Sequence, residues 1–256
     1  MMSMDRRNFL KTLGILSLTT VTGCVSSNYI KKALEDGLYD FDDILVDCYD
    51  DLLDGVIEFD TKIKYKHDKK TGEEKSYGLG FRKGNKLITT SHLIRKKNLR
   101  LRTPFGIAII PTETIDRKVF FPDGEGEIIF EDVGSDIAVI EMPKEYKREF
   151  PFGNSDELKI GTYTTTVGKS LGKNVLVKSG RVVSTSGKEK LYLSDLVGKE
   201  NVFLVWGINI PGDSGGAVYA FRDGNPEIVG MVDARYDGIG ENHKINHILT
   251  IVKKYI

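Results

Sequence analysis

The stretch Ile210-Pro-Gly-Asp-Ser-Gly-Gly-Ala-Val-Tyr219 places a serine among glycines, directly before an apolar run that favours a β-strand. A serine hydroxyl is a useful nucleophile only when a base takes its proton and amide N–H groups receive the charge that develops on the substrate oxygen. Gly212 permits a turn in which its own N–H and that of Ser214 point into one concavity, and Gly215 and Gly216 let a substrate approach closely. A glycine-rich hairpin turn without chemistry explains the same residues, so the rest of the chain has to decide.

Composition excludes several classes of protein. The chain has 256 residues, of which 40% are hydrophobic, enough to bury one large core or two small ones. Lys and Arg number 37, as do Asp and Glu, so no net charge indicates a nucleic-acid partner. No apolar run reaches the roughly 20 residues that a membrane-spanning helix needs.

The first 23 residues are expected to be a signal peptide. Arg6-Arg-Asn-Phe-Leu-Lys11 precedes a modest apolar run, Leu13 to Val21, and is similar to a twin-arginine export signal. Val21-Thr-Gly-Cys24 resembles a lipoprotein processing box, which predicts lipidation of Cys24 and anchoring to a membrane of the cell envelope, on its periplasmic or extracellular face. An uncleaved N-terminal anchor is the alternative, and it also places the domain outside the cytoplasm.

Residues 24–55 are expected to form a lipidated tether followed by an acidic helix. Apolar residues recur there at helical spacing, with Asp42 or Asp43 as the N-cap and Gly55 as the stop. The recurring apolar positions are Ile44, Leu45, Cys48, Tyr49 and Leu52. The carboxylates between them do not follow a calcium-loop pattern, so we interpret them as the solvated face of the helix.

From Val56 onward the pattern changes to short strands without intervening helices, which indicates antiparallel barrels or sandwiches. We predict an all-β fold of two six-stranded antiparallel β-barrels, at residues 56–145 and 146–256, with a C-terminal helix at His247–Tyr255. The candidate strands of the first half are Lys62–Lys66, Tyr77–Phe81, Lys86–Thr90, Leu99–Thr103, Ile107–Ile110, Glu127–Phe130 and Asp136–Met142, with a charged loop at His67–Lys75. Those of the second half are Tyr163–Val167, Val175–Ser179, Arg181–Ser184, Val202–Trp206, Gly216–Phe221 and Ile228–Val232.

Chain order decides what the serine means. The glycines around Ser214 also fit the nucleophile elbow of α/β-hydrolases, but that motif needs a helix after the serine and the acid and histidine later in the chain. Here a strand-like run follows, and the later histidines, His243 and His247, lie at the start of the terminal helix. The opposite order is present instead: His92 ends Leu-Ile-Thr-Thr-Ser-His, and Asp136 begins Asp-Ile-Ala-Val-Ile.

At this point the sequence resembles the trypsin/chymotrypsin-fold serine endopeptidases, and among them the HtrA/Deg-like branch. The resemblance covers about residues 56 to 250 and implies chymotrypsin-like barrels. It implies that His92 is the general base, that Asp136 orients and stabilises the imidazole, and that Ser214 is the nucleophile. The N–H groups of Gly212 and Ser214 would form the oxyanion hole. HtrA-like chains generally carry PDZ domains after the protease, whereas this one stops at Ile256.

Substrate preference is only weakly indicated. The resemblance places Ile208 and Asn209 near the floor of the primary specificity pocket, and Asp233, Ala234 and Arg235 on the strand that lines its wall. Ile208 favours a medium-sized apolar residue before the scissile bond, whereas Arg235 would attract an acidic one.

Asp213 stands where many trypsin-like enzymes pair an aspartate with a newly cut N-terminal amine. A lipidated Cys24 has no free amine, so another cation is needed, and Arg181 and Arg235 are the candidates.

The sequence therefore predicts an exported serine endopeptidase that acts on protein or peptide substrates and needs no cofactor. The alternative is a catalytically idle trypsin-like fold that binds polypeptides in the envelope. We expect no metal site: His243 and His247 have metal-like spacing but no nearby third ligand. The oligomeric state is left open.

Overall fold

The computed structural model describes residues 41–96, 98–103, 106–144, 146, 148–170, 174–187, 198–207, 212–222, 224–236 and 238–256. The expected signal peptide and lipidated Cys24 lie outside these ranges. Helix α3, Phe41–Asp54, confirms the acidic helix and ends before Gly55. It begins one residue before Asp42, so the N-cap prediction was wrong and both predicted caps lie in the first turn. Among the described residues, every helix is too short or too polar to cross a membrane.

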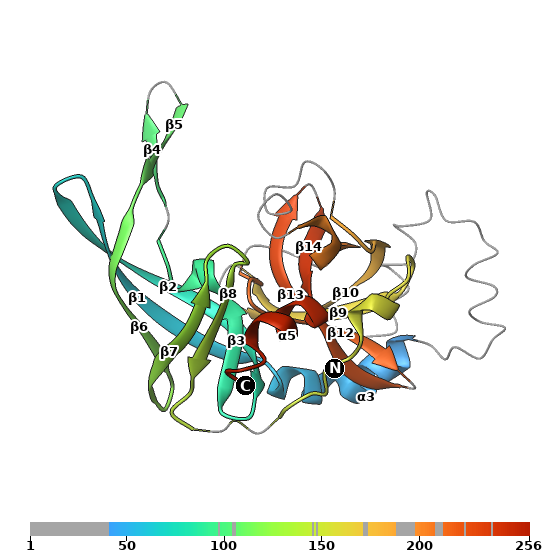
Figure 1. The fold of residues 1–256 in the computed structure, drawn as a ribbon. Coiled ribbons are helices and arrows are strands. Elements are labelled where there is room, and N and C mark those ends of the chain that lie inside the picture. Colours follow the sequence, from blue (N-terminus) through green and yellow to red (C-terminus); the bar gives the residue numbers. More distant parts are fainter. Residues whose placement is uncertain are drawn as a thin grey trace, which may run out of the picture. The chain divides into compact units, whose positions relative to one another are not determined.

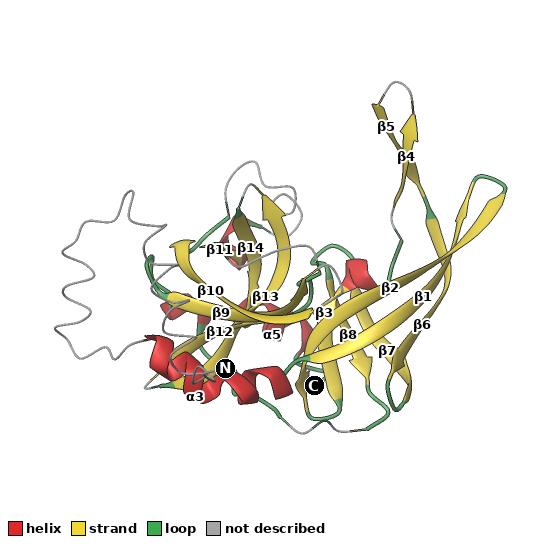
Figure 2. Cartoon of the chain, turned by 180° about the vertical axis from the view of Figure 1, so that it is seen from behind, coloured by secondary structure: helices red, strands yellow, loops and turns green. Residues whose placement is uncertain are grey.

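Two closed six-stranded barrels form the body of the protein, as predicted (Figures 1 and 2). Both lie within one compact unit, Leu52–Ile256. The first barrel has the order β1-β2-β3-β8-β7-β6, with bounds β1 Ile57–His67, β2 Lys70–Lys83, β3 Lys86–Thr90, β6 Glu113–Phe121, β7 Gly124–Asp132 and β8 Ile137–Glu141. The second has the order β10-β11-β14-β13-β12-β9, with bounds β9 Tyr163–Ser170, β10 Asn174–Ser184, β11 Val202–Trp206, β12 Ala217–Arg222, β13 Asn225–Tyr236 and β14 Ile239–Lys244.

Several details of the predicted strands were wrong. The strands predicted near 99–110 exist, as β4 (Asn98–Thr103) and β5 (Gly106–Pro111), but they form a separate two-stranded hairpin, and β6 takes the expected place in the barrel. The charged loop predicted at His67–Lys75 is the tip of the long β1–β2 hairpin. In the second half, the two strands predicted on either side of Gly180 are the single strand β10, and β14 was not predicted.

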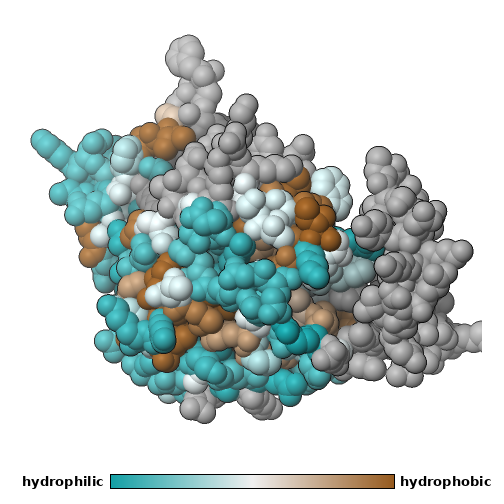
Figure 3. Space-filling model, turned by 45° about the vertical axis from the view of Figure 1, so that its right-hand side comes forward, coloured by the Kyte–Doolittle hydropathy of each residue, from teal (hydrophilic) through white to brown (hydrophobic). Residues whose placement is uncertain are grey.

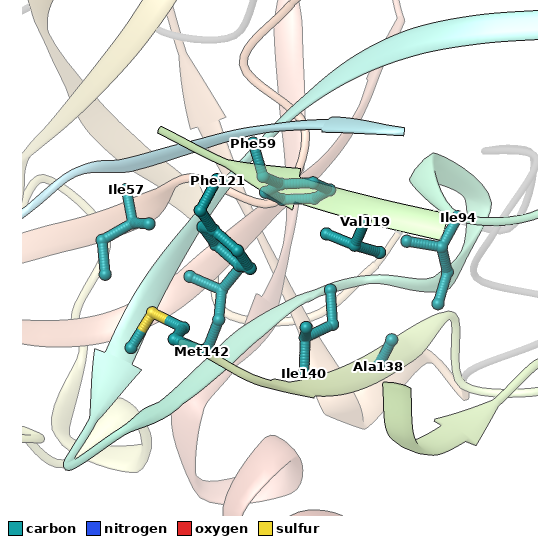
Figure 4. Packing of buried hydrophobic residues seen from close by; sticks show 9 residues of the cluster. Ile57, Phe59, Ile94, Val119, Phe121, Ala138, Ile140 and Met142 are labelled. Carbon is teal, nitrogen blue, oxygen red and sulfur yellow. The ribbon is translucent and has the colours of Figure 1, made fainter. Parts of the chain in front are cut away.

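The interior of the first barrel explains why its strands form. Along β1 the buried positions alternate with more exposed ones, as the two-residue period of a strand requires. Figure 4 shows side chains from several strands meeting in this core. The cluster consists of Ile57, Phe59, Leu87, Ile94, Val119, Phe121, Ala138, Ile140 and Met142. Each large aliphatic or aromatic side chain buried in this way contributes about 1.5–3 kcal/mol.

The second barrel has its own apolar core, built on Leu158, Val182, Phe203, Val205, Val218, Val229 and Val232. Helix α5, Ile245–Val252, buries Ile245, Ile248 and Val252, one face of a helix. It begins two residues earlier than predicted. After it, Tyr255 stacks on Phe130 of β7, with ring centroids 4.3 Å apart, so the C-terminal segment packs against the first barrel.

Short 3-10 turns complete the described elements: η1 Ser91–Leu93, η2 Ser155–Glu157 and η3 Lys199–Asn201. On the face shown in Figure 3, hydrophobic residues are interspersed with a larger number of hydrophilic ones. Among the exposed hydrophobic side chains are Ile109, Ile160 and Trp206.

Candidate active site

His92 lies in η1, the turn that directly follows β3. The turn is anchored on both sides, because Ser91 and Ile94 are buried and the Ile94 N–H donates to the Ser91 carbonyl at 3.0 Å. The His92 side chain remains 37% exposed. A base that must meet a substrate needs this combination of a fixed main chain and an accessible ring.

Asp136 contacts both the main chain and the side chain of His92. One carboxylate oxygen accepts from the His92 main-chain N–H at 2.8 Å, and the other is 2.6 Å from His92 Nδ1. An ionised carboxylate can only accept, so this contact fixes the proton on Nδ1 and leaves Nε2 as the basic nitrogen. Asp136 has a φ of 53°, a left-handed conformation that is uncommon for a residue with a side chain. Such strain is concentrated at functional sites.

A second carboxylate, Glu131 of β7, supports the same turn. It accepts from the Ser91 hydroxyl at 2.6 Å and from two nitrogens of Arg95 at 2.8 Å each, and Arg117 also contacts it. Burial by itself raises the pKa of Glu131, but the hydrogen bonds from Arg95, Ser91 and Arg117 outweigh it and bring the pKa to about 2. Ser91, the residue before His92, thus donates to an ionised carboxylate, Glu131, that accepts several hydrogen bonds.

We therefore expect Glu131→Gln to lower the free energy of unfolding at pH 7 by about 2 kcal/mol, the scale of hydrogen bonds to a charged group. The pKa in the folded state is depressed from an unfolded value of about 4.3. The stabilisation is therefore present above about pH 4.3 and lost as pH falls toward 2. Urea unfolding of both proteins at several pH values measures this. The difference should shrink on acidification, and a constant difference would contradict the assignment. Glu125→Gln, which breaks an exposed pair with Lys118, is the control and should cost less than about 1 kcal/mol.

The turn that carries Ser214 depends on its glycines. Gly212 has φ 103° and Gly215 φ 83°, both in the region that favours glycine. A Cβ on Gly215 would lie 2.1 Å from the Leu79 carbonyl oxygen, so this residue brings the turn against strand β2 of the first barrel. The Gly215 N–H donates to the Val232 carbonyl at 2.8 Å, which fixes the turn to β13.

Asp233 of β13 connects the serine with the histidine. Its main-chain oxygen accepts from the Ser214 hydroxyl at 3.3 Å, and its carboxylate Oδ1 lies 4.0 Å from His92 Nδ1. The side chain of Asp233 is fully buried. Sequence reasoning placed this residue on the wall of a substrate pocket, and the burial leaves only its main chain for that role.

The partner of Asp213 is Lys178 on β10, which sequence reasoning missed. The Lys178 ammonium contacts Asp213 Oδ2, and the two side chains are 14% and 0% exposed. Gly168 of β9 makes room for the pair, because a Cβ there would lie 1.8 Å from Asp213 Oδ1. Burial lowers the pKa of Lys178, although its contacts with Asp213 act in the opposite direction.

Arg181 was the wrong candidate for this role. Its guanidinium lies over the Tyr163 ring, 4.0 Å from the centroid, and donates to the Tyr163 hydroxyl. The other candidate, Arg235, has no described side chain. A signal for Lys178 existed in the sequence as a lysine in an otherwise apolar strand run, Val-Leu-Val-Lys.

Next to His92 and Asp136 lies a second acid–imidazole contact that sequence reasoning also missed. His243 Nε2 of β14 is 2.9 Å from Asp233 Oδ2, and both side chains are fully buried. The sequence pattern places His243 at the start of the terminal helix, but the residue belongs to β14, the strand before that helix. Because the preceding residues Gly-Glu-Asn are not apolar, the sequence pattern gave no strand signal there.

His92, Asp136 and Asp233 bring ligand-type atoms within 4.8 Å of one another. A metal ion does not fit between the first two as they stand. Two ligands each about 2.0–2.2 Å from a zinc ion, at a tetrahedral angle, lie more than about 3 Å apart. The 2.6 Å between His92 Nδ1 and Asp136 Oδ2 is instead a hydrogen-bond distance.

The remaining predicted site residues have partial descriptions. Ile208 and Asn209 lie outside the described residues. Ala234 and Arg235 belong to β13, where they pair with Glu241 and Gly240 of β14, and their side chains are not described. Substrate binding by these residues therefore stays a prediction.

The sequence is similar to curated proteins over part of its length. It is 32% identical over 114 residues to a protein of Chlamydia trachomatis described as "Probable periplasmic serine endoprotease DegP-like", and 32% identical over 109 residues to one with the same description from Chlamydia pneumoniae. These matches cover 44% and 43% of this chain but only 22% and 21% of the relatives. No protein-family model matches the chain.

Solved structures agree over a longer stretch. The HtrA-type protease AlgW with a decapeptide superposes with a TM-score of 0.58 at 17% identity, over 82% of this chain and 66% of that one. The Rv3671c protease of M. tuberculosis in its active form gives 0.53 at 17% identity, over 77% and 80%. Together with the two closed barrels and the C-terminal helix, these likenesses show that the chain has the chymotrypsin-like fold of the HtrA-type serine proteases.

Proposed function

We propose that the chain is a serine endopeptidase that hydrolyses peptide bonds through His92, Asp136 and Ser214. The observation that carries the proposal is the 2.6 Å contact between His92 Nδ1 and Asp136, which leaves Nε2 ready to accept a proton. Ser214 is held by its glycine turn against Asp233, the residue whose side chain faces His92. The partial similarity to DegP-like endoproteases supports the same function.

In the proposed reaction, the Ser214 hydroxyl first turns from the Asp233 carbonyl, because its single hydrogen cannot serve two acceptors. His92 Nε2 takes this hydrogen while the serine oxygen attacks the substrate carbonyl. The imidazolium then gives the proton to the leaving amine, and an acyl-enzyme remains. Water, activated by His92 in the same way, releases the acid. Asp136 stabilises the imidazolium throughout.

The N–H groups of Gly212 and Ser214 are the proposed donors to the oxyanion. Each such donor is typically worth about 3–4 kcal/mol in the transition state. The positive φ of Gly212 supports this role, since it lets the two amides point to one side of the turn. The Lys178–Asp213 pair is proposed to hold the turn in that conformation.

Proteins or peptides are the proposed substrates, because the solved HtrA-type relatives include complexes with a tripeptide and a decapeptide. An exported enzyme, anchored in the cell envelope through a lipid on Cys24, is proposed from the N-terminal sequence and from the periplasmic description of the curated relatives. Ile208, Asn209 and the 233–235 strand are proposed to shape the substrate pocket.

Labelling by a fluorophosphonate probe tests the proposal. The folded protein should be labelled at Ser214, and Ser214→Ala and the heat-unfolded protein should not, because only the assembled site activates the hydroxyl. Gel fluorescence and mass spectrometry of the modified peptide measure this. A folded wild-type protein that is not labelled would exclude the active enzyme and favour an idle, polypeptide-binding fold.

A further inference from the structure

Asp233 and His243 form a buried acid–imidazole pair that no step of the proposed reaction uses. Their side chains are fully buried, with His243 Nε2 2.9 Å from Asp233 Oδ2. Burial of a charged or strongly polar group is costly unless it is paired. A carboxylate and a histidine buried in the protein interior therefore need an explanation beyond packing.

The backbone is built to bring Asp233 there. The register between β13 and β14 shifts between Val232 and Ala234: Val232 pairs with Asn242, but Ala234 already pairs with Glu241. Asp233 is thus the extra residue of a β-bulge. Bulges re-aim a side chain and are over-represented next to active sites. In a regular strand, successive side chains alternate between the two faces, so the side chain at 233 would point to the face opposite to that of residues 232 and 234.

The bulge places the Asp233 carboxylate against the catalytic pair. Its Oδ1 is 4.0 Å from His92 Nδ1, and carboxylate oxygens of Asp233 and Asp136 lie within 4.8 Å of each other. Two buried carboxylates this close repel each other unless a cation offsets the repulsion. Within the described residues around them, His243 lies in direct contact with Asp233 and can be that cation.

The charged groups around His243 favour its protonated form. Burial favours the neutral imidazole, but Asp233 of β13, Asp136 and Glu241 of β14 outweigh it and raise the pKa of His243. Burial would likewise raise the pKa of Asp233, but His243, His92 and Asp136 lower it. On α5, burial and then the charge of His243 lower the pKa of His247, so this neighbour adds no competing cation.

We propose that Asp233 and His243 are positioning residues for the candidate catalytic pair: a proton on His243 keeps Asp233 ionised, and Asp136 stays in its place behind His92. This inference rests on the proposed function. If the charge on His243 is removed, Asp233 takes up a proton instead and donates it in a hydrogen bond to Asp136. Asp136 then becomes a weaker acceptor from His92 and a weaker stabiliser of the His92 imidazolium.

The proposal is tested by measuring kcat and KM as a function of pH in variants that remove the charge of His243, of Asp233, or of both. His243→Gln should lower kcat by about 10–100-fold with little change in KM, and should move the acid limb of kcat/KM down by about one pH unit. Asp233→Asn should lose less, because the new amide is neutral and can donate to Asp136. The double variant His243→Gln/Asp233→Asn should recover the wild-type acid limb and most of kcat. It has lost the Asp233 carboxylate, so no cation is needed at position 243. His247→Gln is the matched control and should leave the acid limb in place.

The proposal would be overturned if the losses in kcat were additive in the double variant, or if the acid limb of His243→Gln did not move. Either result would show that Asp233 and His243 contribute only packing. Nitrogen NMR of the imidazole rings in Ser214→Ala gives a readout that needs no turnover. His243 should be an imidazolium through pH 6–8 and become neutral in that range when Asp233→Asn is added. A neutral His243 in Ser214→Ala would disprove the charged Asp233–His243 pair even if the wild-type enzyme is active. Failure of fluorophosphonate labelling would instead disprove the proposed function, and the charge of His243 could still be measured by NMR.

Discussion

Replacement of Asp136 by asparagine is expected to lower kcat by about 10⁴, the scale seen when the acid of a serine-protease triad becomes an amide. The geometry explains the size of the effect. The oxygen of the amide would still accept from the His92 main-chain N–H, now 2.8 Å from the carboxylate, so its NH₂ would face Nδ1. Nδ1 would then have to accept, which forces the proton onto Nε2. A ring protonated at Nε2 cannot take the Ser214 proton.

The substitution preserves size and most of the contacts, so the loss should appear in kcat at nearly unchanged KM. Thermal unfolding and steady-state kinetics on a peptide substrate measure the two effects separately. Ser91→Ala is a useful comparison, because it removes the hydroxyl bond to Glu131 but leaves the main-chain bond from Ser91 to the Asp136 carbonyl. A loss of less than tenfold in Asp136→Asn would show that another group orients His92.

The sequence alone was sufficient for the architecture and for the order of the candidate catalytic residues. Alternating strands such as β1 and turns with obligatory glycines carry their signal locally, in the period of burial and in the backbone conformation. His92, Asp136 and Ser214 were recognisable because each stands next to such a strand or turn. The structure brings His92 and Asp136 together directly, and Ser214 through Asp233.

The two strands that were not predicted from the sequence, β14 and β6, have patterns in which burial does not follow polarity. Strand β14 was not predicted because its buried residues Glu241, Asn242 and His243 are polar. His243 is buried against Asp233 of β13, and Asn242 donates to the Gly240 carbonyl. Strand β6 was missed for a different reason. Its apolar residues lie on both faces, because Ile115 and Phe120 are exposed whereas Val119 and Phe121 are buried, so they set no two-residue period in the sequence.

Lys178 shows the same limit at the level of one residue. A lysine in a strand ordinarily points to solvent, and the apolar run Val-Leu-Val before Lys178 is too weak a signal to mark it as buried. Its role follows only from tertiary contacts: the carboxylate of Asp213 from the serine turn, and the space that Gly168 leaves beside both groups. The candidates chosen from sequence were arginines, since Arg is the commoner choice for a buried pair.

Replacement of Lys178 by methionine is expected to lower the free energy of unfolding by about 3–5 kcal/mol, because it leaves the Asp213 carboxylate buried without its cation. The turn would relax to expose that carboxylate, and the N–H groups of Gly212 and Ser214 would lose their common direction. We therefore also expect the rate of fluorophosphonate labelling to fall at least 10²-fold, the scale of losing an oxyanion donor. Urea unfolding and labelling kinetics measure the two effects.

The double variant Lys178→Met/Asp213→Asn separates loss of charge balance from loss of packing. An amide at position 213 is neutral and needs no cation, so the double variant should recover most of the stability and a large part of the labelling rate. Lys169→Met on the neighbouring strand β9 is the matched control. Its ammonium pairs with Glu58 at 2.5 Å in a partly exposed position, and its loss should cost no more than about 1 kcal/mol. If Lys178→Met behaves like this control, or if the double variant is no better than the single one, Lys178 does not hold the serine turn.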